Sequence, residues 1–144
     1  MPVVDASVCV ALFKADEPGH EAARAWLTAT LSAGEPVVSP AILLAEVAAA
    51  LARGLAPTMG GAAEVMRAVE LLRRRTLVEL FPVTEGLAAR AAAVAAEHRL
   101  RGADAIYVAL AGQLAMPLIT FDRQQIERGA AAVEIRRPAG DAAS

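Results

Sequence analysis

Four acidic residues stand where the surrounding sequence is apolar. They are Asp5 in Val3-Val4-Asp5-Ala6-Ser7, Glu46 in Leu43-Leu44-Ala45-Glu46-Val47, Asp104 in Ala103-Asp104-Ala105-Ile106, and Asp122 after Leu118-Ile119-Thr120-Phe121. Carboxylates drawn together in an apolar setting repel one another and lose hydration, and a hard divalent cation relieves both costs. Mg²⁺ prefers oxygen ligands. A carboxylate pocket that holds it suits phosphoryl chemistry, in which the metal activates water and binds the phosphate.

Three of these acids also have an ordinary structural explanation. Asp5 could cap the helix that follows it, and Asp122 with Gln125 matches a capping box. Asp104 would interact favourably with the dipole of its helix. Glu46 is harder to explain, because no basic residue lies three or four positions from it along the chain. The four acids together are therefore more informative than any one of them.

Short apolar runs alternate with amphipathic or alanine-rich stretches. We expect strands at 3–4, 36–38, 78–83, 118–121 and 133–135, and helices at 7–14, 20–31, 39–53, 61–75, 84–100, 104–115 and 122–128. Ser39-Pro40 is typical of a helix start, with Ser as N-cap and Pro in the first position. Thr84 is the expected cap of its helix, and Gly102 the residue that ends it. Alternation of this kind predicts a parallel sheet with helices on both faces.

Such a sheet would bring the four acids to one place. In open parallel sheets the ligand site lies beyond the carboxyl ends of the strands. Asp5 and Asp122 each come directly after a strand, and Asp104 falls in a first helical turn. Glu46, expected about two turns into its helix, could reach the same crevice.

The composition limits the class of protein. The chain has 144 residues, of which 56% are hydrophobic and 21% charged, so a largely disordered chain is excluded. We expect one domain over residues 1–137, followed by a loose tail at 138–144. A net charge of −2 argues against binding nucleic acid by bulk positive charge alone.

The cellular location follows from weaker signals. The single cysteine, Cys9, cannot form an intrachain disulfide, which favours a cytoplasmic protein. The uncharged stretch 105–121 contains Gly112 and Pro117 and is at the lower limit for a membrane span. A helix followed by a short strand explains it better, so no membrane association is expected.

The motifs around the four acids resemble those of the PIN domain family, in particular the VapC-like toxins of toxin–antitoxin pairs. They are Val-Val-Asp5-Ala-Ser7, Leu-Leu-Ala-Glu46-Val, Leu100-Arg-Gly-Ala-Asp104-Ala-Ile-Tyr-Val-Ala-Leu-Ala111 and Leu118-Ile-Thr120-Phe-Asp122-Arg. Each motif is weak by itself, and their order and spacing carry the resemblance. It extends from Val3 to about Ile135.

The resemblance implies a three-layer α/β/α domain with a short parallel sheet, and an endoribonuclease that depends on Mg²⁺ or Mn²⁺ and acts as a toxin. It implies that the metal is held by Asp5, Glu46, Asp104 and Asp122, with Ser7 and Thr120 in supporting positions. An RNA substrate, a cognate antitoxin and a homodimer are implied as well. The arginines beside the third and fourth motifs are candidates for RNA phosphate contacts, namely Arg99, Arg101, Arg123 and Arg128.

Two other functions remain open at this point. The chain could be a non-catalytic RNA- or protein-binding module of the same fold, which a nuclease assay with and without EDTA would reveal. It could also be a phosphatase or phosphotransfer protein with Asp5 as the nucleophile. Such enzymes usually carry a second Asp two residues later, where this chain has Ser7, and need a lysine, of which Lys14 is the only one.

Overall fold

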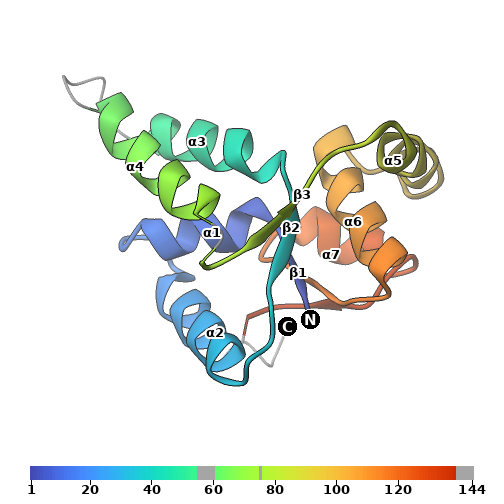
Figure 1. Ribbon diagram of the computed structural model, residues 1–144. Coiled ribbons are helices and arrows are strands. Elements are labelled where there is room, and N and C mark those ends of the chain that lie inside the picture. The colour runs from blue at the N-terminus through green and yellow to red at the C-terminus, as the bar shows by residue number, and fades with distance from the viewer. Residues whose placement is uncertain (55–60, 75, 139–144) are drawn as a thin grey trace.

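The computed structural model of the protein describes residues 1–54, 61–74 and 76–138. The described residues form a five-stranded parallel sheet in the order β3-β2-β1-β4-β5, connected by helices (Figure 1). The strands are β1 (Val3–Val4), β2 (Val38–Pro40), β3 (Glu79–Phe81), β4 (Leu118–Ile119) and β5 (Ile135–Arg136). The helices are α1 (Ala6–Phe13), α2 (His20–Ser32), α3 (Leu43–Gly54), α4 (Gly61–Arg73), α5 (Glu85–His98), α6 (Gly102–Leu114) and α7 (Arg123–Gly129).

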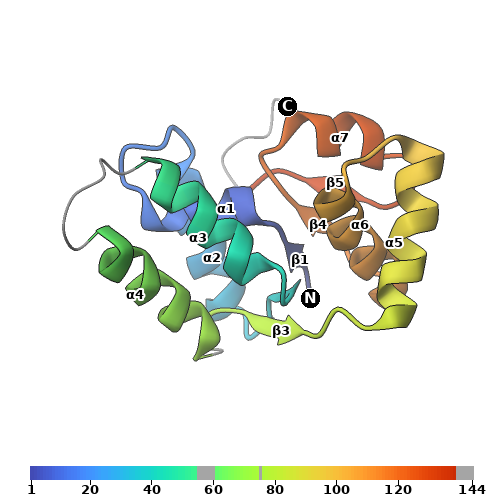
Figure 2. The same cartoon turned by 90° about the horizontal axis from the view of Figure 1, so that it is seen from above.

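The sheet is enclosed by helices, which confirms the three-layer α/β/α prediction. Both views show α1 to α4 on one side and α5 to α7 on the other (Figures 1 and 2). Strand β1 lies at the centre, where Val3 pairs with Val38 on one side and with Leu118 on the other. Strands covered on both faces are typically apolar throughout, as the two adjacent strands β1 (Val3–Val4) and β4 (Leu118–Ile119) are.

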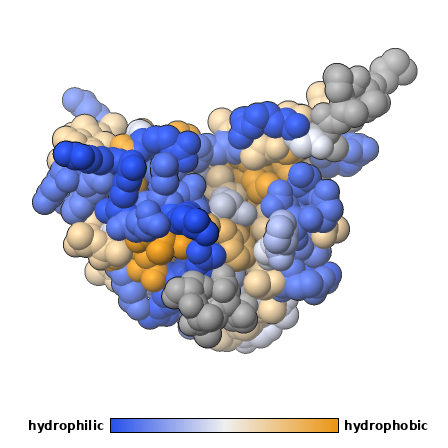
Figure 3. Space-filling view, turned by 180° about the vertical axis from the view of Figure 1, so that it is seen from behind, coloured by the Kyte–Doolittle hydropathy of each residue, from blue (hydrophilic) through white to orange (hydrophobic). Residues whose placement is uncertain are grey.

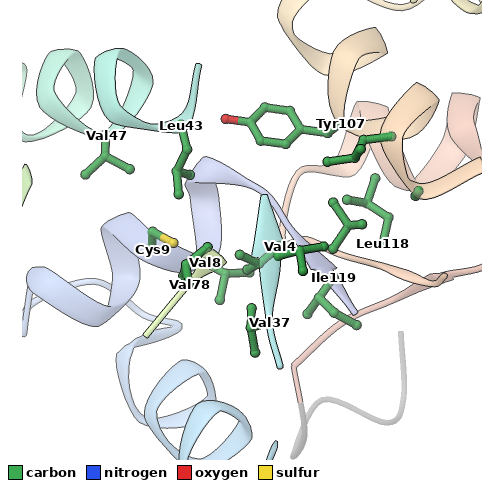
Figure 4. Close-up of a cluster of buried hydrophobic side chains, with 14 of the residues drawn as sticks. Val4, Val8, Cys9, Val37, Leu43, Val47, Val78, Tyr107, Leu118 and Ile119 are labelled. Carbon is green, nitrogen blue, oxygen red and sulfur yellow. The ribbon is translucent and has the colours of Figure 1, made fainter. Parts of the chain in front are cut away.

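The core lies where the central strands meet α1, α3 and α6. Figure 4 shows Leu43 of α3 and Tyr107 of α6 on one side of Val4, Val8 and Ile119, and all five belong to one buried cluster. Tyr107 is 1% exposed, as expected for a core residue. Cys9 is also fully buried in this cluster, where it packs as a small apolar side chain.

The predicted helix start at Ser39-Pro40 is wrong, because both residues belong to β2. The Ser39 hydroxyl donates a hydrogen bond of 2.8 Å to the buried carbonyl of Val4 in the neighbouring strand, so it does not cap a helix. Pro40 pairs with Phe81 of β3. Helix α3 therefore begins at Leu43, three residues later than the Ser-Pro signal suggested.

Other boundaries differ by smaller amounts. Thr84 is the N-cap of α5, as predicted, and its hydroxyl accepts from the backbone N–H of Leu87 at 3.1 Å. The helix ends earlier than expected, at Arg99, which adopts a left-handed conformation with φ of 57°. Gly102 is the first residue of α6 and not the residue that ends α5. Strand β4 ends two residues before the predicted Phe121, and β5 is displaced to Ile135–Arg136.

The surface adds little evidence on partners. On the face in Figure 3, the hydrophobic areas are separated by hydrophilic residues. Within the described ranges, no helix is both long enough and apolar enough to cross a membrane. Most of the predicted tail, residues 139–144, and Arg75 at the expected end of α4 lie outside the described residues. Pro138, the first residue of that tail, is buried.

Gly19, the N-cap of α2, should not tolerate a side chain. A Cβ atom there would lie 2.7 Å from Cζ of Phe121, the residue between Thr120 and Asp122. Gly19→Ala should destabilise the protein by about 1–3 kcal/mol because the ring must move. Gly102→Ala is the matched control, since a Cβ there meets nothing within 4 Å. Thermal melts of both variants measure the difference. Equal melting temperatures would show that the Phe121 ring is not held against α2.

Candidate active site

The four acids all lie at the N-terminal ends of helices that leave the carboxyl edge of the sheet. Asp5 is the N-cap of α1 and Asp122 is the N-cap of α7. Asp104 lies in the first turn of α6. Glu46 lies in the first turn of α3, not two turns into its helix as expected, because α3 begins at Leu43.

Asp5 is a buried carboxylate held by two hydroxyl groups. Its side chain is 4% exposed. Oδ1 accepts hydrogen bonds from the backbone N–H of Ser7 at 3.0 Å and from the Ser7 hydroxyl at 2.6 Å. Oδ2 accepts from the Thr120 hydroxyl at 2.6 Å. Ser7 and Thr120, expected as supporting residues, therefore contact the first acid directly.

The same two hydroxyls connect the ends of β1 and β4. The Ser7 hydroxyl oxygen accepts from the backbone N–H of Phe121 at 2.9 Å. The Thr120 hydroxyl oxygen accepts from the backbone N–H of Asp122 at 2.9 Å. Each hydroxyl thus donates to Asp5 and accepts from the β4–α7 connection, so the position of Asp122 depends on that of Asp5.

The environment of Asp5 favours its protonated form. Burial raises its pKa from 3.8 to about 7, and the negative charge of Asp122 adds to the rise. The hydrogen bonds from the Ser7 and Thr120 hydroxyls act in the opposite direction and do not offset the loss of hydration. The influence of Asp122 also shows that these two acids lie close enough to repel each other.

Asp104 and Asp122 share one guanidinium group. Arg101 Nε donates to Asp104 Oδ2 at 3.2 Å, and Arg101 Nη2 lies 3.6 Å from Asp122 Oδ2. Burial raises the pKa of Asp104, and the charge of Asp122 raises it further, whereas Arg101 lowers it. The Arg101 side chain is 70% exposed, so this pairing is open to solvent.

The predicted capping box at Asp122 is only half present. Asp122 Oδ1 accepts from the backbone N–H of Gln125 at 3.0 Å, as an N-cap should. In a full box the Gln125 side chain would return to the backbone N–H of Asp122. That N–H binds Thr120 instead, and the Gln125 carboxamide reaches Asp104. Gln125 is therefore a site residue that the sequence reasoning missed, because the capping box already explained it.

Glu46 approaches the other acids from the opposite side of the crevice. It is half-buried, and its charge raises the pKa of Asp104 and of the buried Tyr107 hydroxyl. Glu46 and Ser7 both line an open groove of about 470 Å³ that continues past Arg53 and Phe121. The structure therefore brings Glu46 to the same region, although within the described residues no hydrogen bond joins it to the other three acids.

The donor set suits a hard cation, although the side chains are not yet arranged around one. Across the described ranges, no group of three or more His, Cys, Asp or Glu side chains could hold a metal ion as it stands. An ionised carboxylate offers about four acceptor sites. Protein groups use three of them on Asp5, which leaves one on Oδ2. The Oδ2 atoms of Asp104 and Asp122 face only the exposed Arg101.

The arginine candidates have different environments. Arg101 is engaged with two site acids, as described. Arg128 Nη1 donates to the backbone carbonyl of Arg99 at 2.8 Å, so it fixes the end of α5. Arg99 and Arg123 are exposed near the site, and their contact with RNA stays a prediction.

Asp5→Asn should change how stability depends on pH. In EDTA, the folded wild type keeps a proton on Asp5 that the unfolded chain releases between pH 3.8 and about 7. Asp5 therefore makes stability fall as the pH rises through that interval and level off above it. The Asn variant lacks this loss of stability. Its free energy of unfolding should therefore rise relative to that of wild type from pH 4 to pH 7, by at most about 4 kcal/mol. Denaturant titrations at several pH values measure it.

The exposed Asp16 provides the control for this experiment. Asp16→Asn should follow the pH dependence of the wild type. A constant difference between Asp5→Asn and wild type across the interval would contradict a raised pKa of Asp5.

The comparisons with known proteins agree with this geometry. The family model described as "PIN domain" matches residues 3–131. Among curated proteins, none matches the sequence at a significant level.

Several solved structures share the fold. VapC20 of Mycobacterium tuberculosis, described as a sarcin-ricin loop cleaving toxin, is 24% identical with a TM-score of 0.71, over 94% of this chain and 99% of that one. FitAcB from Neisseria gonorrhoeae is 22% identical with a TM-score of 0.70, over 94% and 96% of the two chains. VapBC-5 of Mycobacterium tuberculosis, a member of the VapBC family of toxin-antitoxin systems, is 27% identical with a TM-score of 0.60, over 94% and 97%. Because the family match covers most of the sequence and the fold agrees with it, this chain belongs to the PIN domain family.

Proposed function

We propose that this protein is a Mg²⁺-dependent endoribonuclease that hydrolyses RNA phosphodiester bonds and serves as the toxin of a toxin–antitoxin pair. The observation that carries the proposal is the placement of four acids around one edge of the sheet, three of them connected by shared hydrogen-bond partners. The similarity of this chain to VapC20, described as a toxin that cleaves the sarcin-ricin loop, supports RNA as the substrate.

Asp5, Glu46, Asp104 and Asp122 would hold Mg²⁺ or Mn²⁺, directly or through water. When bound, the ion would supply an activated water molecule and compensate the charge of the scissile phosphate. Ser7 and Thr120 orient Asp5 and exclude water from its inner side. Arg101 balances part of the negative charge when the acids have no other cation.

The exposed arginines beside the site would contact the RNA backbone. Arg123 follows Asp122 at the start of α7, and Arg99 lies at the end of α5. Arg101, released from Asp104 and Asp122, would be free to bind phosphate. Such contacts position the strand and carry no sequence preference by themselves.

The environment of Asp5 disfavours a phosphatase with an aspartate nucleophile. Both of its oxygens accept hydrogen bonds, and it is buried, whereas a nucleophile must reach phosphorus. The only lysine, Lys14, lies 3.6 Å from Glu17 and lines a different part of the surface. A binding module without catalysis remains the second candidate, and the assay below separates it from a nuclease.

The proposal places the protein in the cytoplasm as a homodimer, together with a cognate antitoxin. The similarity to VapBC-5, described as a member of a family of toxin-antitoxin systems, supports the antitoxin. The acidic crevice would accept a basic side chain from that partner, as it now accepts Arg101. Expression of the wild-type chain should inhibit growth, and expression of an inactive variant should not. This comparison tests the toxin role.

Glu46→Gln tests the enzyme directly. The change keeps the shape of the side chain and removes a charge that a bound cation needs, so RNA cleavage in Mg²⁺ should fall by at least about 100-fold. The melting temperature should stay close to that of wild type. Cleavage of a structured RNA, followed on gels with Mg²⁺ or EDTA, provides the measurement.

Glu127→Gln on the exposed face of α7 is the matched control and should cleave like wild type. A wild-type protein that binds RNA but does not cut it in Mg²⁺ or Mn²⁺ would favour the binding module. Full activity of a folded Glu46→Gln protein would remove Glu46 from the site.

Asp122 has two separable roles, N-cap and proposed metal ligand. Asp122→Ser keeps an oxygen for the backbone N–H of Gln125, so stability without metal should change little, whereas Asp122→Ala should cost about 1 kcal/mol. Both variants lose the negative charge. Both should therefore need more Mg²⁺ for half-maximal cleavage. If Ser restores full activity at ordinary Mg²⁺ and Ala does not, Asp122 acts only as a cap.

A further inference from the structure

Gln125 is a fully buried polar side chain in the first turn of α7. It is 0% exposed and ranks among the largest fully buried side chains. Its Nε2 group donates to the backbone carbonyl of Asp104 at 3.3 Å and to Asp104 Oδ1 at 3.4 Å. Its Oε1 atom is buried and, within the described residues, has no hydrogen-bond partner.

Packing alone does not explain an amide at this position. A buried acceptor without a partner destabilises the folded state, whereas Met or Leu would fill a similar volume without an unpaired polar atom. The amide therefore destabilises the fold relative to an apolar side chain. What only the amide provides is the pair of N–H donors directed at Asp104.

Gln125 also contacts a second acid. Its backbone N–H donates to Asp122 Oδ1 at 3.0 Å. The Oδ1 atoms of Asp104 and Asp122 thus both face Gln125, and the Oδ2 atoms of both face Arg101. Gln125 is buried and Arg101 is 70% exposed, so the Oδ1 contacts are the permanent ones and the Oδ2 contacts can be exchanged.

We propose that Gln125 is a positioning residue, whose buried carboxamide orients Asp104 so that Oδ2 stays available to a divalent cation while Oδ1 is occupied. The inference rests on the proposed function of the acids. It extends that function by a residue that acts through Asp104 and does not touch the substrate. Groups that orient metal-binding side chains typically contribute about 10- to 100-fold in metal affinity or activity.

Gln125→Met tests this role with a readout that does not depend on catalysis. Without metal, the variant should melt at the same temperature as wild type or higher, since the unpaired Oε1 is gone. The Mn²⁺ or Mg²⁺ concentration needed for half of the metal-induced rise in melting temperature should increase about 10- to 100-fold. The Mg²⁺ needed for half-maximal RNA cleavage should increase by the same factor, and saturating Mg²⁺ should restore most of the rate.

Gln124→Met is the matched control, because Gln124 precedes Gln125 in the same helix and is exposed. It should behave like wild type in all three measurements. Gln125→Leu serves as a second apolar variant if Met disturbs the fold.

The experiment distinguishes a failure of the positioning role from a failure of the proposed function. If the wild type cleaves RNA in Mg²⁺ and Gln125→Met needs no more metal than Gln124→Met, the positioning role is wrong and the proposed function stands. A structural role alone would instead lower the melting temperature without metal and leave the metal requirement unchanged, which also overturns the inference. If the wild type neither binds metal nor cleaves RNA, the proposed function and this inference both fail.

Discussion

The burial of the Asp5 carboxylate is the constraint on which the rest of the site depends. Raising its pKa from 3.8 to about 7 corresponds to about 4 kcal/mol of unfavourable free energy for the charged form. This cost remains although the hydroxyls of Ser7 and Thr120, which follow the two adjacent strands β1 and β4, donate hydrogen bonds to the carboxylate. The same hydroxyls accept from the backbone of Phe121 and Asp122. The buried carboxyl group of Asp5 thereby determines where the β4–α7 connection begins and where Asp122 lies.

The arrangement of the other acids follows a single electrostatic rule. Each of the four stands at the cap or in the first turn of a helix, where the partial positive charge of the helix end is favourable to a carboxylate by about 0.3–1 kcal/mol. That contribution is several times smaller than the cost of burying Asp5. Arg101 compensates Asp104 and Asp122 further, but from an exposed position. The helix ends and Arg101 therefore offset part of the unfavourable free energy of bringing these acids together.

Much of this could be predicted from the sequence, because the strongest signals are local. Val3-Val4 and Leu118-Ile119 are strands because short β-branched and apolar runs fit a sheet covered on both faces. The four acids were recognisable because charges in such surroundings are uncommon. Ser39-Pro40 misled the prediction, since the same dipeptide can start a helix or end a strand. Here the dipeptide ends a strand, and the hydrogen bond from Ser39 to the carbonyl of Val4, which is distant in sequence, is the contact that distinguishes the two cases. Gln125 was overlooked for a similar reason, since its contact with Asp104 lies 21 residues away and a local cap already accounted for it.

The position of Glu46 shows how one boundary changes the interpretation of a site. Had α3 begun at Ser39, Glu46 would stand about two turns along the helix. Because Ser39 and Pro40 extend β2, the helix begins at Leu43, and Glu46 falls in its first turn like the other acids in theirs. Glu46, which has no basic residue three or four positions away on its helix, thus lines the same groove as Ser7. The hydrogen bond from Ser39 to the Val4 carbonyl holds Ser39 in β2, so α3 begins only after Pro40 and Glu46 lies in its first turn.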